Sequence, residues 1–142
     1  MKAEQIFSIA NLVAMFGWIL LAVAPRWKWT QKIVISGNIS LLLGIAYLIL
    51  VVLFFGSADG NFGSLAGVMK LFTNEWAVLA GWIHYLAFDL FVGSWEVKDA
   101  RENGISHWLV IPCLFFTFML GPIGLLLYSI LRFFLAKEVK ND

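Results

Sequence analysis

The sequence is poor in the residues that build disulfides, metal clusters and charged surfaces. It holds one cysteine, Cys113, and two histidines among 142 residues. A single cysteine excludes an intrachain disulfide and a metal site made of several cysteines, and it leaves the redox state of the compartment open. Only 13% of the residues are charged, and the net charge is +1. Because the basic residues are scattered and form no stripe, the sequence predicts no nucleic-acid partner.

Several catalytic patterns are missing as well. The chain shows no Ser/His/Asp triad, no glycine-rich phosphate loop and no internal repeat. Apolar residues, by contrast, are abundant: they make up 61% of the chain, and its mean hydropathy is +0.87. This share lies well above that of a soluble domain. The composition therefore predicts a single integral membrane domain that covers residues 1–142, with membrane lipid as its surroundings.

Four apolar stretches are long enough to cross about 30 Å of hydrocarbon at 1.5 Å per residue. They cover residues 4–24, 33–55, 76–95 and 108–135. The first stretch is interpreted as a retained helix and not a signal peptide, because Asn11 interrupts it and Pro25 would follow the cleavage site. The sequence therefore predicts an all-α fold, a four-helix transmembrane bundle.

Three connections join these predicted spans. The segment PRWKWTQK at 25–32 mixes tryptophans with cations, which predicts a short turn at the lipid headgroups. Between helices 2 and 3, the loop GSADGNFG precedes the segment SLAGVMKLFT, whose one-face spacing predicts a short interfacial amphipathic helix. That face holds Leu65, Val68, Met69 and Phe72. The segment EVKDARENG at 96–104 is strongly charged and predicts a solvated loop.

The membrane orientation is not predicted by these four spans. An even number of spans places both termini on one side, together with Lys2, Lys70, Arg132, Lys137 and Lys140. The opposite side then holds Arg26, Lys28, Lys32, Lys98 and Arg101. Cytoplasmic loops carry an excess of lysine and arginine. Because the two sides carry equal numbers, the rule gives no preference.

Small residues recur at helical spacing within the spans, as in helices that pack closely in lipid. In the last span this stripe is formed by Cys113, Thr117, Gly121, Gly124 and Tyr128. Pro122 lacks a backbone donor and is expected to kink that helix. We interpret such stripes as packing faces, with the walls of a ligand cleft as the alternative.

An aspartate and a histidine interrupt the third span, GWIHYLAFDLFVG at 81–93. A carboxyl group within a span costs about 2.5–3.5 kcal/mol on insertion scales, so Asp89 needs compensation. His84 points about 140° away from Asp89 around the helix. We interpret Asp89 as a proton donor or acceptor, with a structural bridge between helices as the alternative. For His84 the alternatives are a role facing the ligand and a hydrogen-bonded core histidine.

Counting residues from the third connection gives the relative depths of these groups. Asp89 is expected level with Cys113, Asn38 and Trp18, and Asn38 is its expected hydrogen-bond partner. His84 is expected about 7.5 Å deeper, level with Thr117. The sequence thus predicts two polar layers inside the bundle.

The chain holds two histidines and carboxylates, the residue types that form the facial triad of non-haem iron enzymes. His107 begins the fourth span, about 16 Å from His84 along the membrane normal. Ligand bonds of about 2 Å do not cover that distance unless a helix breaks or a second chain contributes. The sequence therefore requires no metal or other cofactor, and mononuclear iron stays as the alternative.

The motif GWIHYLAFDLFVG is accompanied by PCLFFTFMLGPIGLLLY at 112–128 and by FSIANLVAMFGWILLAVAPRW near the start. Together they resemble the abscisic-acid-deficient-4-like membrane proteins, and the resemblance, to a bacterial-type member, covers nearly the whole chain. Plant members are implicated in making neoxanthin from violaxanthin, in which an epoxide opens and an allene forms. The resemblance therefore implies a carotenoid-type substrate and a multi-pass location, the cell membrane if the protein is bacterial.

The resemblance also implies an enzymatic function. The expected activity is isomerisation of a carotenoid or related isoprenoid by acid and base, or its oxidative cleavage to an apocarotenoid. Asp89 and His84 match the polar positions of the family motif and are the candidate catalytic residues. A non-catalytic pigment-binding or assembly protein is the main alternative, and a small transporter is the third. A homo-oligomer is possible.

Flat apolar side chains and a few polar groups are the candidate substrate contacts. They are Trp18, Trp82, Tyr85 and Tyr128, with Asn11, Asn38 and Thr117 as polar groups that orient a ring oxygen. Aromatic side chains in membrane helices also serve simply as packing or lipid-facing groups.

Overall fold

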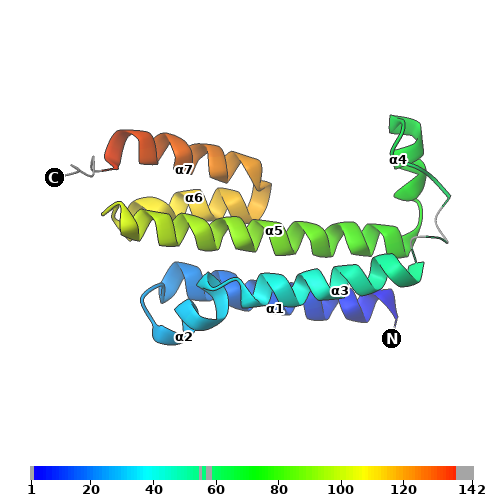
Figure 1. Ribbon diagram of the computed structural model, residues 1–142, viewed down its shortest axis with the longest axis horizontal. Helices are drawn as coiled ribbons and strands as arrows, with labels where there is room; N and C mark the ends of the chain where they lie inside the picture. The colour runs from blue at the N-terminus through cyan, green and yellow to red at the C-terminus, as the bar shows by residue number, and fades with distance from the viewer. Residues whose placement is uncertain (1, 55, 57–58, 137–142) are drawn as a thin grey trace. The chain divides into compact units, whose positions relative to one another are not determined.

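The structure is a computed structural model that describes residues 2–54, 56 and 59–136. Its helices are α1 (Ala3–Val23), α2 (Lys28–Thr30), the π-helix η1 (Gln31–Ile35), α3 (Asn38–Phe54), α4 (Leu65–Leu71), α5 (Glu75–Glu102), α6 (His107–Leu120) and α7 (Pro122–Leu135) (Figure 1). No strand occurs in the described part, so the all-α class is confirmed there. The predicted end of the second span at Phe55, the loop residues Ser57 and Ala58, and the tail lysines Lys137 and Lys140 lie outside the described residues.

The chain divides into two compact units. Unit 1 comprises Met1–Met15 and Ile39–Phe88, and unit 2 comprises Phe16–Asn38 and Asp89–Asp142. Helices α1 and α5 each contribute one part to both units. The two candidate catalytic residues consequently belong to different units, with His84 in unit 1 and Asp89 in unit 2.

Three helical segments are long and apolar enough to cross a membrane. They are Ala3–Val23, Lys28–Phe54 and Glu75–Glu102. The second segment is not one regular helix, because η1 and Gly37, with φ of +84°, interrupt it before α3 begins. Its helical path also starts inside the stretch that we expected to be a turn. The count of four spans is therefore not confirmed.

The fourth predicted span, 108–135, is not a single helix. Helix α6 ends at Leu120, and α7 starts at Pro122 and runs back beside α6 (Figure 1). Gly121 makes the reversal with φ of +45° and ψ of −93°, a conformation that favours glycine. Pro122 occupies the first position of α7, where its missing N–H has no partner to lose. The proline expected to kink one helix therefore begins a second one.

Close packing holds α6 and α7 together as a hairpin. A Cβ atom on Gly124 would collide with the main chain and the hydroxyl of Thr117, so the two helices touch there. The whole small-residue stripe of the last span is buried, but it is shared by two helices. Its members are Cys113, Thr117, Gly121, Gly124 and Tyr128. The stripe is thus a packing face between helices that fold back on each other.

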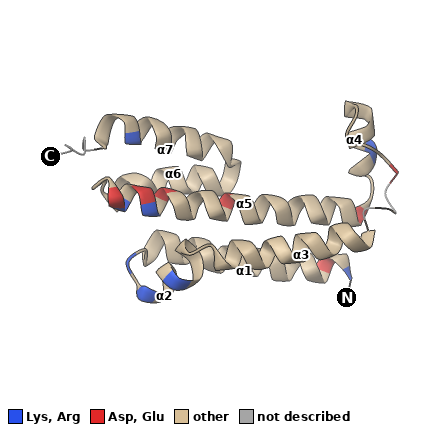
Figure 2. Ribbon diagram, in the orientation of Figure 1, with Lys and Arg blue, Asp and Glu red and all other residues tan. Residues whose placement is uncertain are grey.

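The segment 96–104, predicted as a solvated loop, is largely helical. Helix α5 continues to Glu102, and Gly104, with φ of +69°, follows it. Glu96 is completely buried, because it falls on the same face of α5 as Gly93 and Ala100, which are also buried. Figure 2 shows acidic and basic residues together in these last turns of α5. The prediction was wrong because it treated charge as a sign of solvent exposure.

A short helix between the second and third long segments is present as predicted. Ser64 caps α4, since its Oγ accepts a hydrogen bond from the backbone N–H of Gly67 at 3.1 Å. Leu65 and Met69 on the predicted apolar face are exposed, and Leu71 on another face is buried. Contact of that exposed face with the membrane surface stays a prediction.

Candidate functional site

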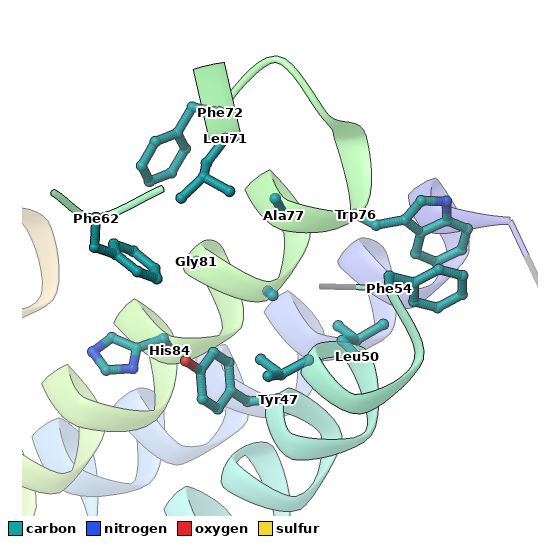
Figure 3. A pocket seen from close by; sticks show the side chains of 12 residues that line it. Tyr47, Leu50, Phe54, Phe62, Leu71, Phe72, Trp76, Ala77, Gly81 and His84 are labelled. Atoms are coloured by element: carbon teal, nitrogen blue, oxygen red, sulfur yellow. The ribbon is translucent and has the colours of Figure 1, made fainter. Parts of the chain in front are cut away.

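Unit 1 contains an apolar cavity of about 260 Å³ between α3, α4 and the first half of α5 (Figure 3). Its lining residues are mainly aliphatic and aromatic: Tyr47, Leu50, Val51, Phe54, Phe62, Leu71, Phe72, Trp76, Ala77, Ala80, Gly81 and His84. Phe54 and Trp76 stack face to face at 4.0 Å with only 7° between their rings. This stacked pair gives the cavity a flat aromatic wall.

Two polar side chains, Tyr47 and His84, lie next to each other at the cavity. Their ring centroids are 5.4 Å apart at an angle of 60°, and Figure 3 shows the Tyr47 hydroxyl beside His84. The ring centroid of Phe88, one turn further along α5, lies 4.7 Å from that of His84. Tyr47 comes from α3 and His84 from α5, so contact between these two helices within unit 1 creates the pair.

The cavity suits a hydrophobic group that carries one polar atom. Its volume is slightly below the range of about 300–1,000 Å³ that is typical of small-molecule sites, so it accepts part of a long ligand. Gly81 leaves room on the α5 wall, where a Cβ atom would lie 3.3 Å from the ring of Phe72. A hydroxyl donor and an imidazole are able to bind a ligand oxygen and to transfer a proton.

Three other predicted substrate contacts in unit 1 lie outside the cavity lining. The indole N–H of Trp82 donates to Asn11 Oδ1 at 3.0 Å and so links α5 to α1. The side-chain amide of Asn11 in turn donates to the carbonyl of Phe7 at 2.8 Å. Tyr85 stacks at a tilt on Trp82, with 5.3 Å between ring centroids. The Trp82–Asn11 hydrogen bond joins two helices, whereas the other two contacts each lie within one helix, and a role of these residues in substrate binding stays a prediction.

In unit 2, Asp89 lies at the tip of the α6–α7 hairpin. A Cβ atom on Gly121 would come within 2.8 Å of Asp89 Oδ1, so only glycine leaves space for this carboxyl group. Asp89 itself is half-buried. We expected it level with Cys113, and this register is wrong because α5 continues to Glu102, through most of the segment that we counted from as a loop. The Asn38 side-chain amide donates to the carbonyl of Lys32 at 2.9 Å; its bond to Asp89 stays a prediction.

A second carboxyl group, that of Glu96, is buried about two helical turns after Asp89 along α5. The hydroxyl of Thr117 donates to its Oε1 at 2.8 Å, so Thr117 is not level with His84 as expected. On the same face of α5, the ring of Trp18 occupies the space beside Gly93, where a Cβ atom would lie 2.6 Å from it. Trp18 also meets Phe118 edge to face at 5.6 Å. Both Trp18 and Thr117 thus pack inside unit 2.

A polar cluster joins α7 to the end of α5. Asp99 Oδ2 accepts hydrogen bonds from the Tyr128 hydroxyl at 2.6 Å and from Arg132 Nε at 2.7 Å. Tyr128 is completely buried and meets Trp95 edge to face at 5.4 Å. Sequence reasoning missed Glu96 and Asp99, although a helical spacing that continues from Asp89 would have placed Glu96 on the buried face.

Removal of the Tyr128 hydroxyl is expected to destabilise the protein more than removal of the Arg132 charge. Tyr128→Phe leaves Asp99 without a buried donor and is expected to cost about 2 kcal/mol, as for hydrogen bonds to charged groups. Arg132→Gln is expected to cost clearly less, because 45% of the arginine side chain is exposed and water screens its charge. Thermal unfolding in detergent measures both. Equal losses of stability in the two variants would contradict the stronger, buried hydrogen bond that we assign to Tyr128.

The two histidines have separate surroundings. His107 Nε2 lies 2.9 Å from the carbonyl oxygen of Ala22, a contact inside unit 2. Across the described ranges, no group of three or more His, Cys, Asp or Glu side chains is close enough to hold a metal ion. Of the two histidines, His84 lines the apolar cavity of unit 1, and His107 does not.

The model of the family described as ABA DEFICIENT 4-like matches residues 5–128, which include both units' candidate residues. Protein ABA DEFICIENT 4, chloroplastic, from Arabidopsis thaliana is 27% identical over 149 aligned positions. The alignment covers 99% of this chain but 64% of that protein, so the chain spans less than two thirds of the relative's length. No solved structure matches the chain.

Proposed function

Because the chain belongs to the ABA DEFICIENT 4-like family, we propose that it is a multi-pass membrane protein that acts on a carotenoid or related isoprenoid within the bilayer. The observation that carries this proposal is the apolar cavity of unit 1, with Tyr47 and His84 as its paired polar groups. The cavity would hold one end group of the ligand, and the polyene would extend from it along apolar surface.

The proposed reaction is an isomerisation that needs one acid and one base. As the epoxide C–O bond breaks, the acid gives a proton to the oxygen. The base removes a proton from a nearby carbon, and that C–H electron pair forms the new double bond of the allene. Atoms and electrons balance, so no oxidant is required. We assign the base to His84 and the donor to the Tyr47 hydroxyl, and proton return from His84 to Tyr47 resets the pair.

Asp89, the other predicted catalytic residue, takes no part in the His84–Tyr47 proton exchange, and its role as a proton donor or acceptor in unit 2 stays a separate prediction. Its carboxyl group is packed against Gly121 at the tip of the hairpin. A carboxyl group enclosed in this way within a membrane protein supports a specific role for the side chain. The alternative role, a structural bridge, predicts that Asp89→Asn leaves product formation unchanged while it alters stability.

Expression in carotenoid-producing hosts tests the proposed activity. Hosts that accumulate β-carotene, zeaxanthin or violaxanthin would each receive the full chain, and extracted pigments would be separated by chromatography. We expect a new pigment of unchanged mass for isomerisation, or a shorter carbonyl product for oxidative cleavage. Pigment that purifies with the protein but is not converted would indicate a non-catalytic binding protein. An unchanged profile without bound pigment in all three hosts would contradict the proposal.

The hairpin predicts a membrane orientation that four spans leave undecided. With three crossings, the described residues Lys2 and Lys70 lie on one side. The other side holds Arg26, Lys28, Lys32, Lys98, Arg101 and Arg132, because α6 and α7 return to it. The positive-inside rule then makes this second side cytoplasmic.

Thiol labelling with a membrane-impermeant reagent measures this orientation. The native Cys113 is buried, so the parent protein should be nearly unlabelled. In intact cells, Lys70→Cys is expected to react and Lys28→Cys is expected to react only after permeabilisation. Labelling of both variants in intact cells would refute the three-crossing arrangement.

A further inference from the structure

Unit 2 contains a second cavity, of about 200 Å³, with a different character. It lies between the link after α1, the last turns of α5 and the start of α6. Two arginines from separate segments, Arg26 and Arg101, line it together with Ser106 and His107. The apolar cavity of unit 1 has no lysine or arginine in its lining. The second cavity is therefore suited to a different ligand.

The two arginines have no acidic partner within the described ranges. The ion pair found there joins Arg132 to Asp99, and neither Arg26 nor Arg101 lies within salt-bridge distance of a described carboxylate. The hydroxyl of Ser106 precedes α6 without making a capping hydrogen bond. Two guanidinium groups and a hydroxyl donor thus line a cavity whose lining residues include no aspartate or glutamate.

This combination matches the chemistry of a phosphate group. Each guanidinium presents paired N–H donors that bind two phosphate oxygens at once, and the charge assists both hydrogen bonds. Because α6 begins at His107, the positive end of its dipole adds to the same field. We propose that this cavity binds the phosphate of an anionic membrane-lipid headgroup.

The surroundings of the cavity favour a lipid over free phosphate. Trp27 and Trp29, in the link that also carries Arg26, are 51% and 44% exposed. The ammonium groups of Lys28 and Lys32 lie 5.9 and 5.6 Å from the ring of Trp29. Exposed tryptophans mixed with cations are typical of the headgroup region of a bilayer. Figure 2 shows these basic residues around α2.

Native mass spectrometry of the full chain in detergent tests the proposal. Phosphatidylglycerol is the anionic probe, phosphatidylcholine is the lipid without net charge, and inorganic phosphate is the free anion. We expect the parent protein to retain phosphatidylglycerol in preference to both. The double variant Arg26→Gln/Arg101→Gln is expected to bind it at least about tenfold more weakly, because it loses charge-assisted hydrogen bonds.

The matched control is Lys2→Gln/Lys70→Gln, which removes the same charge from residues of unit 1 that do not line the cavity. It is expected to keep phosphatidylglycerol affinity within about threefold of the parent protein, since distant surface charges contribute little. Equal weakening in both double variants, or none in the arginine variant, would overturn the site. Inorganic phosphate that binds as tightly as phosphatidylglycerol would overturn the lipid assignment.

A conservative variant keeps the test valid if glutamine at these positions impairs folding. Arg26→Lys/Arg101→Lys preserves both charges but removes the paired donors. We expect it to bind phosphatidylglycerol more weakly than the parent protein and more tightly than the glutamine variant. Affinity equal to that of the parent would show that charge alone is sensed, which contradicts a shaped phosphate site.

Discussion

Gly124→Ala is expected to lower the free energy of unfolding by about 3 kcal/mol or more, a large effect for the addition of one methyl group. In the hairpin this methyl group would collide with the main chain of Thr117 and with its hydroxyl. Main-chain atoms do not move aside as a flexible side-chain end does, so α6 and α7 would have to separate. Thermal unfolding and the yield of monodisperse protein in detergent measure the loss.

The same substitution distinguishes the hairpin from a continuous last span. In one straight helix, Thr117 and Gly124 would be two turns apart, about 10.5 Å along the axis, and alanine at 124 would be harmless. Gly44→Ala in α3 is the matched control, because a Cβ atom there meets no atom within 4 Å. It is expected to be neutral or stabilising by up to about 1 kcal/mol. Equal behaviour of both variants would refute the hairpin.

His84→Gln is expected to reduce pigment conversion at least about a hundredfold, the usual contribution of a general acid or base. Glutamine has a similar size and keeps a hydrogen-bonding group beside Tyr47, so the cavity and the bound pigment should be retained. Loss of turnover with binding unchanged would assign a chemical role to the imidazole. The measurement is product formed per bound pigment over time.

His107→Gln is the matched control, since it alters the other of the two histidines, which lies in unit 2 and contacts Ala22. It is expected to leave conversion within about threefold of the parent protein, because His107 contributes no group to the apolar cavity. Conversion that survives His84→Gln, or that falls equally in both variants, would remove His84 from the proposed chemistry.

The helical class and the long apolar segments follow directly from hydropathy, but the reversal in the last span does not. Residues 108–135 are predominantly apolar, and a hydropathy window does not report the direction in which the chain runs. The reversal depends on a positive φ at Gly121 and on the close approach of Gly124 to Thr117. The dipeptide Gly121-Pro122 was the available signal, since this pair is typical of turns.

The candidate site could be predicted only in part for a related reason. His84 stands out in an apolar helix, but its neighbour Tyr47 comes from another helix, α3, and was not among the predicted site residues. Pairing across two helices depends on their relative depth, and the register counted from the third connection was wrong because α5 continues to Glu102. The buried Glu96 was missed because the charged segment 96–104 was predicted to be a solvated loop, whereas α5 continues through it to Glu102.

The central claim is that the apolar cavity beside His84 holds a carotenoid end group, and filling that cavity tests it most directly. Gly81→Leu would project into the cavity toward Phe72, whereas Gly44→Leu adds the same side chain to α3 at a residue that does not line the cavity. Both variants and the parent protein would be purified from a carotenoid-producing host, and bound pigment would be measured by absorbance per protein. The account predicts pigment with the parent and with Gly44→Leu, and its loss from folded Gly81→Leu. Folded Gly81→Leu that retains pigment at the level of the parent would contradict it.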